Sequence, residues 1–339
     1  MNEVELGVQE RQIIREDILN KQSEILKKQR KKLTARDFEP IKIIGRGAFG
    51  EVRLCRTNKN EYVAVKKLKR KDMVNKNQVK HIMMEKEILS VLKNEWVPEL
   101  RYAFKDSKHL YLVMDYMPGG DLMNLFIEKD IIAEQDAKLY LAELVLAIES
   151  VHKANYIHRD LKPDNILIDQ DGHIKLSDFG LCAKFDIKER INAFTSKNRD
   201  KTSSSKKTRR EKRKLLHSTV GTPDYIAPEI FQQIGYNEIV DWWSLGIIFY
   251  EMIIGYPPFF SDDSSKTYKK ILEWEKHFSI PDDAGISEEA SDLICKLIAD
   301  KRIRLGVNGA AEIKAHPFFQ GIDWKNIKKT KPFFIPEVS

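Results

Sequence analysis

The hydrophobic pattern of the chain changes character near residue 120, and this change constrains the fold more than any other feature. Between Phe38 and Asp115 the apolar residues form short strand-like runs, YVAVKKL and HLYLVMDY, with one helical stretch, VKHIMMEKEILSVLK, between them. After Asp121 helical spacing takes over, in a helix that begins near Glu134 and in the almost wholly apolar segment DWWSLGIIFYEMII, which we expect to be buried. The pattern predicts an α+β fold with a small β-rich lobe followed by a larger α-helical lobe.

Length and composition fit this architecture, and the charge is concentrated in one segment. The 339 residues, 42% of them hydrophobic, can bury one large core or two smaller ones. The formal net charge of +7 is accounted for entirely by residues 196–214, which hold ten lysines and arginines and two acidic residues. The rest of the chain is nearly neutral, which argues against a broad nucleic-acid-binding surface.

The cysteines and the apolar runs give information about the cellular location of the protein. Cys55, Cys182 and Cys295 lack the paired spacing of a zinc site or a disulfide framework, which fits a reducing environment. The N-terminus is charged, unlike a secretory signal, and no apolar run approaches the ~18 residues that a membrane span needs. We therefore expect a soluble, cytoplasmic protein.

A glycine-rich stretch, IIGRGAFGEVRLCR, predicts a phosphate-binding loop. Gly45, Gly47 and Gly50 let backbone N–H groups approach phosphate oxygens without interference from side chains. The same spacing would suit a dinucleotide-binding fold if a helix followed, but the alternating residues of EVRLCR indicate a strand. A glycine loop between two strands does not match the dinucleotide-binding unit.

Lys66 lies in the next strand-like run, VAVK. Burying an ammonium group costs free energy unless anions surround it. Phosphate oxygens and the carboxylate of Glu85, on the following helix, would supply them. The alternative is a lysine that extends into solvent from the end of a strand.

Two later segments, YIHRDLKPDNILID and IKLSDFGLC, place polar residues between short apolar runs. Asp160, Lys162, Asn165 and Asp178 could each form an ordinary surface ion pair if taken alone. In this order and spacing they resemble the catalytic segments of the eukaryotic protein kinases, and the resemblance extends over residues 38–319. Phosphoryl transfer needs carboxylates, metal ions and cations to converge, which agrees with this set.

The resemblance implies a serine/threonine protein kinase that uses ATP and Mg²⁺. It implies that Asp160 accepts the proton of the substrate hydroxyl and that Lys162 neutralises the transferring γ-phosphate. A lysine in the position of Lys162 is typical of the serine/threonine branch. Asn165 and Asp178 match the residues that hold two magnesium ions. The expected catalytic set is Lys66, Glu85, Asp160, Lys162, Asn165 and Asp178.

The resemblance also implies an adenine pocket between the two lobes. Backbone groups of Asp115 and Met117 would bind adenine, and Met114 would lie behind the ring. Apolar side chains from both lobes would enclose the ring while also packing in the core. The expected nucleotide-binding residues are Gly45, Gly47, Gly50, Val52, Ala64, Lys66, Met114, Asp115, Met117, Asp121 and Leu167.

Further positions in the larger lobe match the kinase pattern. Glu229 of APE is expected to pair with Arg304, and Asp241 is expected to anchor the backbone of the catalytic loop. Three acids match a groove that, in basophilic kinases, receives arginines upstream of the target residue, although they could equally be ordinary solvated charges. These acids are Asp121, Asp164 and Glu251.

Longer stretches, NEWVPELRYAFKDSKHLYLVMDYMPGGDLMNLF and STVGTPDYIAPE, resemble the AGC group of kinases. A basic N-terminal helix, NEWV and a long basic insert make the chain similar to the NDR/LATS subgroup of Hippo-type pathways. This resemblance implies a Mob-type co-activator at the N-terminal helix, activation through Ser218, and an upstream Ste20-like kinase that acts on a C-terminal hydrophobic motif. The chain ends at KPFFIPEVS without that motif, so we expect either a shortened chain or the lack of this second switch.

The expected organisation follows from these segments. It comprises a basic helical extension at 1–37, a kinase domain at 38–320 with lobes at 38–117 and 118–320, a basic insert at 186–214, and the start of an AGC-type tail at 321–339. The narrow apolar stripe of the N-terminal helix leaves two roles open, packing on its own domain or docking on a partner.

The basic run SKNRDKTSSSKKTRREKRK holds no large apolar residue and cannot fold by itself. Three roles stay open: a flexible linker, an inhibitory cation beside the acidic groove as the resemblance implies, and a nuclear localisation signal in KKTRREKRK. A specific nucleic-acid binder is disfavoured because the run lacks aromatic residues for base stacking. An inactive scaffold is disfavoured because Lys66, Asp160, Asn165 and Asp178 are all present.

Overall fold

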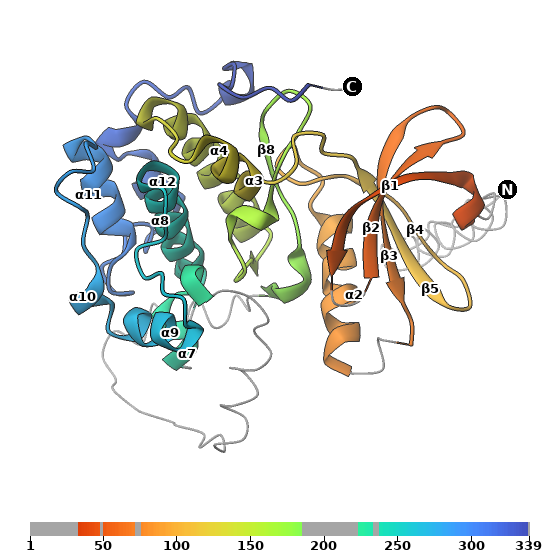
Figure 1. Ribbon diagram of the computed structural model, residues 1–339, viewed down its shortest axis with the longest axis horizontal. Coiled ribbons are helices and arrows are strands. Elements are labelled where there is room, and N and C mark those ends of the chain that lie inside the picture. Colours follow the sequence, from red (N-terminus) through yellow and green to blue (C-terminus); the bar gives the residue numbers. More distant parts are fainter. Residues whose placement is uncertain (1–32, 48–49, 72–75, 185–222, 233–236, 338–339) are drawn as a thin grey trace, which may run out of the picture.

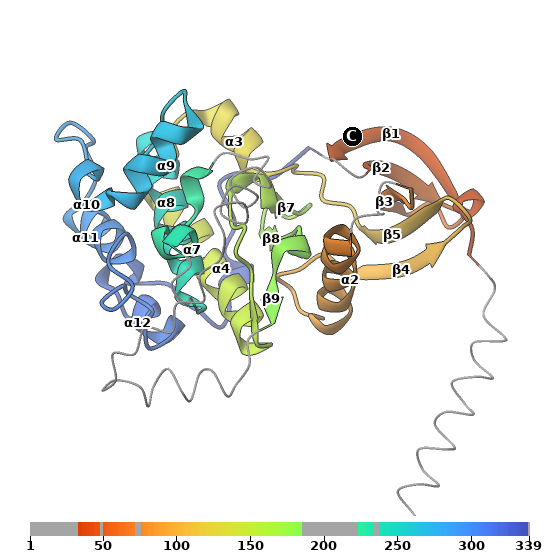
Figure 2. The ribbon, with the colours of Figure 1, turned by 90° about the horizontal axis from the view of Figure 1, so that it is seen from below.

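The structure is a computed structural model that describes residues 33–47, 50–71, 76–184, 223–232 and 237–337. The expected N-terminal helix, the basic insert and Ser218 lie outside these residues. Two lobes lie side by side, and Figures 1 and 2 show them from two directions. Within the described residues, no helix combines the length and apolarity needed to cross a bilayer.

The small lobe is a five-stranded antiparallel sheet in the order β1-β2-β3-β5-β4. Its strands are β1 (Phe38–Gly47), β2 (Gly50–Thr57), β3 (Tyr62–Lys69), β4 (Leu100–Lys105) and β5 (His109–Asp115). Alternate residues of β3, Val63 and Val65, are buried in the core of the sheet, as the period of a strand requires. The helix α2 (Lys76–Val91) lies between this sheet and the large lobe (Figures 1 and 2).

The large lobe is built around α8 (Ile239–Ile254), in which every residue is buried. Helices α4 (Glu134–Lys153) and α11 (Glu288–Leu297) pack against it. Gly246 permits the close approach of α11, because a Cβ at this position would lie only 2.8 Å from the Cβ of Leu297. The other α-helices in the described part of this lobe are α3 (Leu122–Lys129), α7 (Pro228–Gln232), α9 (Ser264–Leu272), α10 (Trp274–His277) and α12 (Ala310–Lys314).

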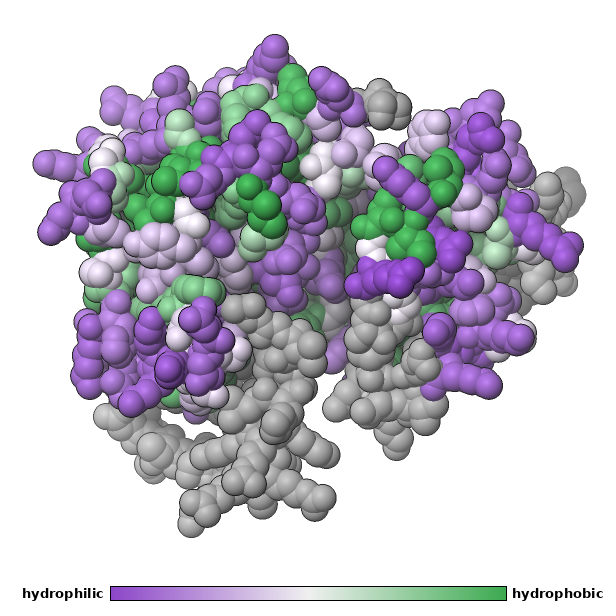
Figure 3. All heavy atoms as spheres, viewed as in Figure 1, coloured by the Kyte–Doolittle hydropathy of each residue, from purple (hydrophilic) through white to green (hydrophobic). Residues whose placement is uncertain are grey.

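Two short antiparallel strand pairs lie on the side of the large lobe that faces the small lobe (Figure 2). β6 (Tyr156–Ile157) pairs with β9 (Ala183–Lys184), and β7 (Ile166–Ile168) pairs with β8 (Ile174–Leu176). On the face seen in Figure 3, hydrophilic atoms predominate and hydrophobic atoms are exposed in smaller groups on both lobes. The predicted α+β architecture is confirmed, including the helix that begins at Glu134 and the buried apolar helix.

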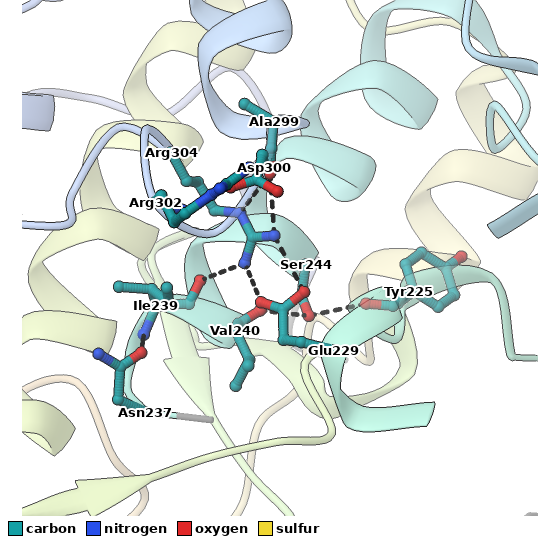
Figure 4. Close-up of polar contacts among 10 residues, drawn as sticks. All are labelled: Tyr225, Glu229, Asn237, Ile239, Val240, Ser244, Ala299, Asp300, Arg302 and Arg304. Carbon is teal, nitrogen blue, oxygen red and sulfur yellow. Dashed lines mark hydrogen bonds and ion pairs between the residues drawn. The ribbon is translucent and has the colours of Figure 1, made fainter. Parts of the chain in front are cut away.

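A buried ion pair between Glu229 and Arg304 joins α7 to the loop that follows α11. Arg304 is fully buried, and its Nη1 and Nη2 donate to the two carboxylate oxygens of Glu229 at 2.5 and 3.1 Å. The guanidinium also donates to the carbonyl oxygens of Ala299 and Ile239 and lies 5.0 Å from the ring centroid of Trp243. Figure 4 shows the hydrogen bonds of Arg304 with Glu229, Ala299 and Ile239. The pairing predicted from the sequence is confirmed.

Removing one member of this pair should leave an uncompensated buried charge. We expect Glu229→Ala to lower the free energy of unfolding by about 3–5 kcal/mol in urea denaturation followed by circular dichroism. The matched control is Arg302→Ala, because Arg302 forms an exposed ion pair with Asp300 in the same loop and should contribute little. Equal losses in the two variants would contradict a bracing role for the buried pair.

Candidate active site

On the small lobe, the structure brings Lys66 and Glu85 together. Lys66 on β3 lies between Val52 of β2 and Leu112 of β5, and its Nζ is 2.6 Å from Oε1 of Glu85 on α2. Burial opposes the charge of Lys66, but the carboxylates of Glu85 and Asp178 outweigh burial and raise the pKa of the ammonium. The head group of Lys66 therefore stays charged and held by Glu85, rather than extending into solvent.

The glycine-rich stretch closes a hairpin between β1 and β2. Gly47 pairs with Gly50, and Gly45 pairs with Val52. A side chain at Gly50 would collide with the backbone carbonyl of Lys67, so only glycine fits there. The predicted strand after the glycines is confirmed, and the stretch lacks the following helix of a dinucleotide-binding unit.

On the large lobe, the catalytic-segment residues form a tight loop between β6 and β7. The side-chain amide of Asn165 donates to the backbone oxygen of Asp160 at 2.8 Å and to its Oδ2 at 3.0 Å. The Nζ of Lys162 lies 3.5 Å from the same Oδ2. Asp160, Lys162 and Asn165 are thus neighbours in space, and the Asp160 carboxylate is oriented by two cooperating donors.

The buried carboxylate of Asp241, at the start of α8, holds this loop. Its Oδ1 accepts from the backbone N–H of Arg159 at 2.9 Å, and its Oδ2 accepts from the N–H of His158 at 2.9 Å. The ring of His152 lies 2.7 Å from Oδ2. Arg159 adopts a left-handed φ of 66°, which costs free energy in a non-glycine residue and needs such anchoring. The predicted anchoring role of Asp241 is confirmed.

Asp178 follows β8 and is joined to the catalytic loop through its neighbour Ser177. The N–H and Oγ of Ser177 donate to the carbonyl oxygen of Asn165 at 2.8 and 3.0 Å. Asp178 itself has a left-handed φ of 56°, and its Oδ1 accepts from the N–H of Gly180 at 3.4 Å. Burial tends to raise the pKa of Asp178, but Lys66, the N–H of Gly180 and the charges of His158 and Lys162 together outweigh burial and lower the pKa. Asp178 is therefore a carboxylate at neutral pH.

Asn165 and Asp178 fit a magnesium ion better than a softer metal. Both offer oxygen ligands, which Mg²⁺ prefers. The amide nitrogen of Asn165 is committed to Asp160, which leaves its carbonyl oxygen as the available ligand. Among the described residues, no group of three or more His, Cys, Asp or Glu side chains could enclose a metal. This suits an ion that takes its remaining ligands from water and substrate phosphates.

The expected adenine-binding residues come from both lobes. On the small lobe, Ala64 of β3 pairs with Met114 of β5. The chain after Asp115 passes to the large lobe, where Asp121 forms a bridge with Leu167 of β7. The Nε of Arg101 on β4 lies 2.6 Å from Oδ1 of Asp115, which ties the end of β5 to β4.

Sequence reasoning missed one acidic residue, Asp224, which lies near the predicted acidic groove. Asp224 is fully buried, and neither of its carboxylate oxygens has a hydrogen-bond partner among the described residues. Nearby, Oε2 of Glu251 accepts from the hydroxyl of Tyr225 at 2.5 Å. Burial raises the pKa of Asp224 to about 6 and that of Glu251 to about 7, and Asp164 contributes to the second shift. The sequence signal for this residue was an acid directly before the tyrosine of GTPDYIAPE, five residues ahead of Glu229.

Asp121 belongs to the same group of acids. It begins α3, where its Oδ1 accepts from the N–H of Asn124 at 2.8 Å. Burial raises its pKa, and the charge of Asp164 adds to the effect. The charge of Asp164 therefore acts on both Asp121 and Glu251. We call the group the acidic cluster; it consists of Asp121, Asp164, Asp224 and Glu251.

Comparison with known proteins agrees with this geometry. Residues 38–319 match the family model described as the protein kinase domain. The chain therefore belongs to the protein kinase family, the class that the two lobes and the convergent site define.

The relatives specify the branch. The chain is 43% identical to the probable serine/threonine-protein kinase ndrB of Dictyostelium discoideum, over all of this chain and 67% of that protein. It is 45% identical to the serine/threonine-protein kinase CBK1 of Pneumocystis carinii, over 94% of this chain and 68% of the relative. It is 43% identical to the kinase tricornered of Drosophila melanogaster, over 93% and 72%. The protein is thus a serine/threonine kinase of the NDR type within the AGC group.

Proposed function

We propose that this kinase transfers the γ-phosphate of ATP to protein serine and threonine residues through the site described above. The observation that carries the proposal is the pair of hydrogen bonds from Ser177 to the carbonyl of Asn165. They tie the segment of Asp178 to the loop of Asp160. Groups of opposite charge from distant parts of the sequence are thereby held in one place before substrate arrives, which is the arrangement that phosphoryl transfer requires.

Each charged group has a distinct proposed role. Asp160 orients the substrate hydroxyl and accepts its proton, and Lys162, 3.5 Å from it, stabilises charge on the transferring phosphoryl group. Lys66, held by Glu85, binds the phosphates of ATP from the small lobe. Asn165 and Asp178 would hold magnesium, which supplies positive charge beside the phosphate oxygens.

The first test removes the charges that are proposed to act on phosphate. We expect Asp178→Ala and Lys66→Met each to lower kcat/KM by about a hundredfold or more, because electrostatic stabilisation is usually the largest catalytic contribution. The measurement is transfer of labelled phosphate from ATP to a serine peptide. Lys67→Met, at the neighbouring position of β3, is the matched control and should keep near-parental activity. Activity of the two site variants within a few-fold of the parent would refute the assignment.

We also propose that the acidic cluster selects substrates with arginine upstream of the target residue. A guanidinium carries several N–H donors in a rigid fork, which matches carboxylate oxygens that lack other partners. Asp224 offers two such oxygens in a fully buried position. Burial disfavours ionisation of both Asp224 and Glu251, and the charges of Asp224 and Asp164 add to this effect at Glu251, so a bound cation would lower the cost of ionising the two groups.

The raised pKa values give this proposal a pH signature. Asp224 and Glu251 lose their protons near pH 6 and 7, so the cluster should bind arginine better as the pH rises through this range. We expect the KM of an arginine-containing peptide to fall about tenfold from about pH 6 to about pH 8. The KM of the same peptide with alanine in place of arginine should change little.

The cluster variants supply the controls for this pH test. Glu251→Gln and Asp224→Asn should flatten the pH dependence, whereas Asp262→Asn, at an exposed position, should preserve it. A preference for acidic or proline-flanked peptides, or a pH dependence that persists in the cluster variants, would contradict the proposal.

Regulation by phosphorylation of Ser218 is a further part of the proposed function. Arg159 directly precedes Asp160 and donates to the carbonyl oxygens of Leu181 and Cys182 at 2.6 and 3.3 Å. Its charge also contributes, after burial, to lowering the pKa of His81 on α2. A phosphate on Ser218 would bring negative charge to Arg159 and order the segment around Ser218 against the loop that carries Asp160.

We propose that the basic insert inhibits the kinase by occupying the acidic cluster. Its charge is complementary to that of the cluster, and its attachment gives it a high effective concentration. A tenfold suppression needs only about 1.4 kcal/mol, which a few screened ion pairs can supply.

Removing the positive charges of the insert should therefore relieve the proposed inhibition. We expect a several-fold rise in basal activity when Lys206, Lys207, Arg209, Arg210, Lys212, Arg213 and Lys214 are replaced by alanine. In the parent, moderate salt should raise activity by screening the contact, and this rise should be absent from the substituted chain. Basal activity that is flat or falls with salt in the parent would leave the insert as a linker or a localisation signal. Ser218→Ala should lower activity in both backgrounds.

The resemblance to NDR-type kinases carries the remaining proposals. They are a Mob-type co-activator at the N-terminal helix, an upstream Ste20-like kinase, a cytoplasmic location, and a nuclear one if KKTRREKRK acts as a localisation signal. Measuring activity with and without a Mob-type protein tests the first of these.

A further inference from the structure

The C-terminal segment, residues 321–337, packs along the large lobe and ends near the junction of the two lobes (Figure 1). Its one-turn helix, Ile327–Lys329, is anchored by the buried side chain of Ile327. Farther along, the ring of Phe333 lies 5.4 Å from that of Tyr140 on α4. The backbone of Phe334 passes so close to Gly172 that no side chain would fit there. The segment is therefore a fitted part of the fold.

Lys328 is the unusual residue of this segment. Its Nζ is buried, and among the described residues it has no hydrogen-bond partner. Instead, the ammonium lies 4.4 Å from the ring centroid of Trp96. A tryptophan face attracts a cation most strongly of the aromatic rings, and the attraction grows when water is excluded. Burial lowers the pKa of Lys328, and the charges of Glu143 and Asp169 act against this shift. The ring of Trp96 is the group that the ammonium directly contacts.

Trp96 lies in the loop of residues 92–99, which connects α2 to β4. Its carbonyl oxygen accepts from the N–H of Leu176 at 2.8 Å, and the carbonyl of Glu95 accepts from Nζ of Lys175 at 2.9 Å. This loop is therefore fastened to β8. Since α2 carries Glu85 and β8 leads directly to Asp178, the loop connects the two carboxylates that flank Lys66.

We propose that Lys328 is a positioning residue, which fixes Trp96 and so holds α2 and β8 in the arrangement that places Glu85 and Asp178. Lys328 touches none of the reacting groups and acts through the ring and the Trp96–Leu176 hydrogen bond. The inference rests on the proposed roles of Glu85 and Asp178. Docking of the C-terminal segment thereby becomes a condition for correct MgATP binding.

A simpler role for Lys328 is to fill space with its aliphatic chain. The two roles differ in what they predict for stability. Lys328→Met keeps an unbranched chain of similar length and removes a buried charge without hydrogen bonds, so it should leave the melting temperature unchanged or raise it. A positioning role requires that activity falls even so, and that Lys328→Arg, which restores a cation over the ring, recovers it.

The experiment uses the full chain with MgATP and a serine peptide. We expect Lys328→Met to raise the KM for MgATP and lower kcat, with a combined loss of about three- to tenfold in kcat/KM, while the KM for the peptide stays the same. Hydrogen exchange at the amide of Leu176 and in residues 92–99 should quicken. The matched control is Lys329→Met, because Lys329 is the exposed neighbour of Lys328 and should leave all these quantities unchanged.

A double-mutant cycle assigns the effect to the ring. Trp96→Leu should reproduce the kinetic loss, and adding Lys328→Met to it should cost little more. Parental kinetics in Lys328→Met, additive losses in the cycle, failure of arginine to restore activity, or a loss that only parallels melting would each overturn the inference. An active Asp178→Ala variant would instead refute the proposed catalytic site. In that case, hydrogen exchange at the amide of Leu176 would still test whether Lys328 holds the loop of Trp96.

Discussion

The buried carboxylate of Asp241 is the constraint on which the arrangement of the site depends. The left-handed backbone of Arg159, beside the carboxylate of Asp160, costs free energy, and Asp241 holds it by accepting from two consecutive N–H groups. The carboxylate itself starts α8, the most completely buried helix of the large lobe. Burial would raise the pKa of Asp241, but its donors, His152 foremost, lower it, so the anchor stays charged. The backbone next to Asp160 is therefore fixed by hydrogen bonds to a residue of the buried core.

From Asp241 a series of short-range contacts connects the other residues of the site. Asn165 binds Asp160, Ser177 binds Asn165, and Asp178 follows Ser177 in the chain. An electrostatic interaction then links the two lobes, because the carboxylates of Asp178 and Glu85 both raise the pKa of Lys66 on the small lobe. Each link is local, yet together they relate groups that stand on different lobes. A site built this way depends on how α2 is held relative to β8, and this is the basis of the role that we propose for the loop that carries Trp96.

The sequence predicted much of this because the relevant signals are local. Period-two runs located β2, β3 and β5, and the apolar run around Trp242 located the buried helix α8. The pairing of Glu229 with Arg304 and the anchoring by Asp241 came from resemblance to kinases, since spacing alone does not bring residues so distant in the chain together. Asp224 and the contact of Lys328 with Trp96 were missed, because burial without a partner is a property of tertiary packing and leaves no periodic trace in the chain.

Buried charges with hydrogen-bonded partners and buried charges without them have different roles in this molecule. Arg304 and Glu229 complete one another, and a pair of this kind mainly secures the shape of the lobe. Within the part of the chain that the structure describes, Asp224 has no donor, and Lys328 has an aromatic face in place of an acceptor. Folding alone would favour apolar residues at both positions, because an uncompensated buried charge costs several kcal/mol of stability (about 3–5 kcal/mol when a partner is removed). Their presence is explained if each charge acts beyond the fold, Asp224 on a cationic substrate and Lys328 on the loop that aligns the two lobes.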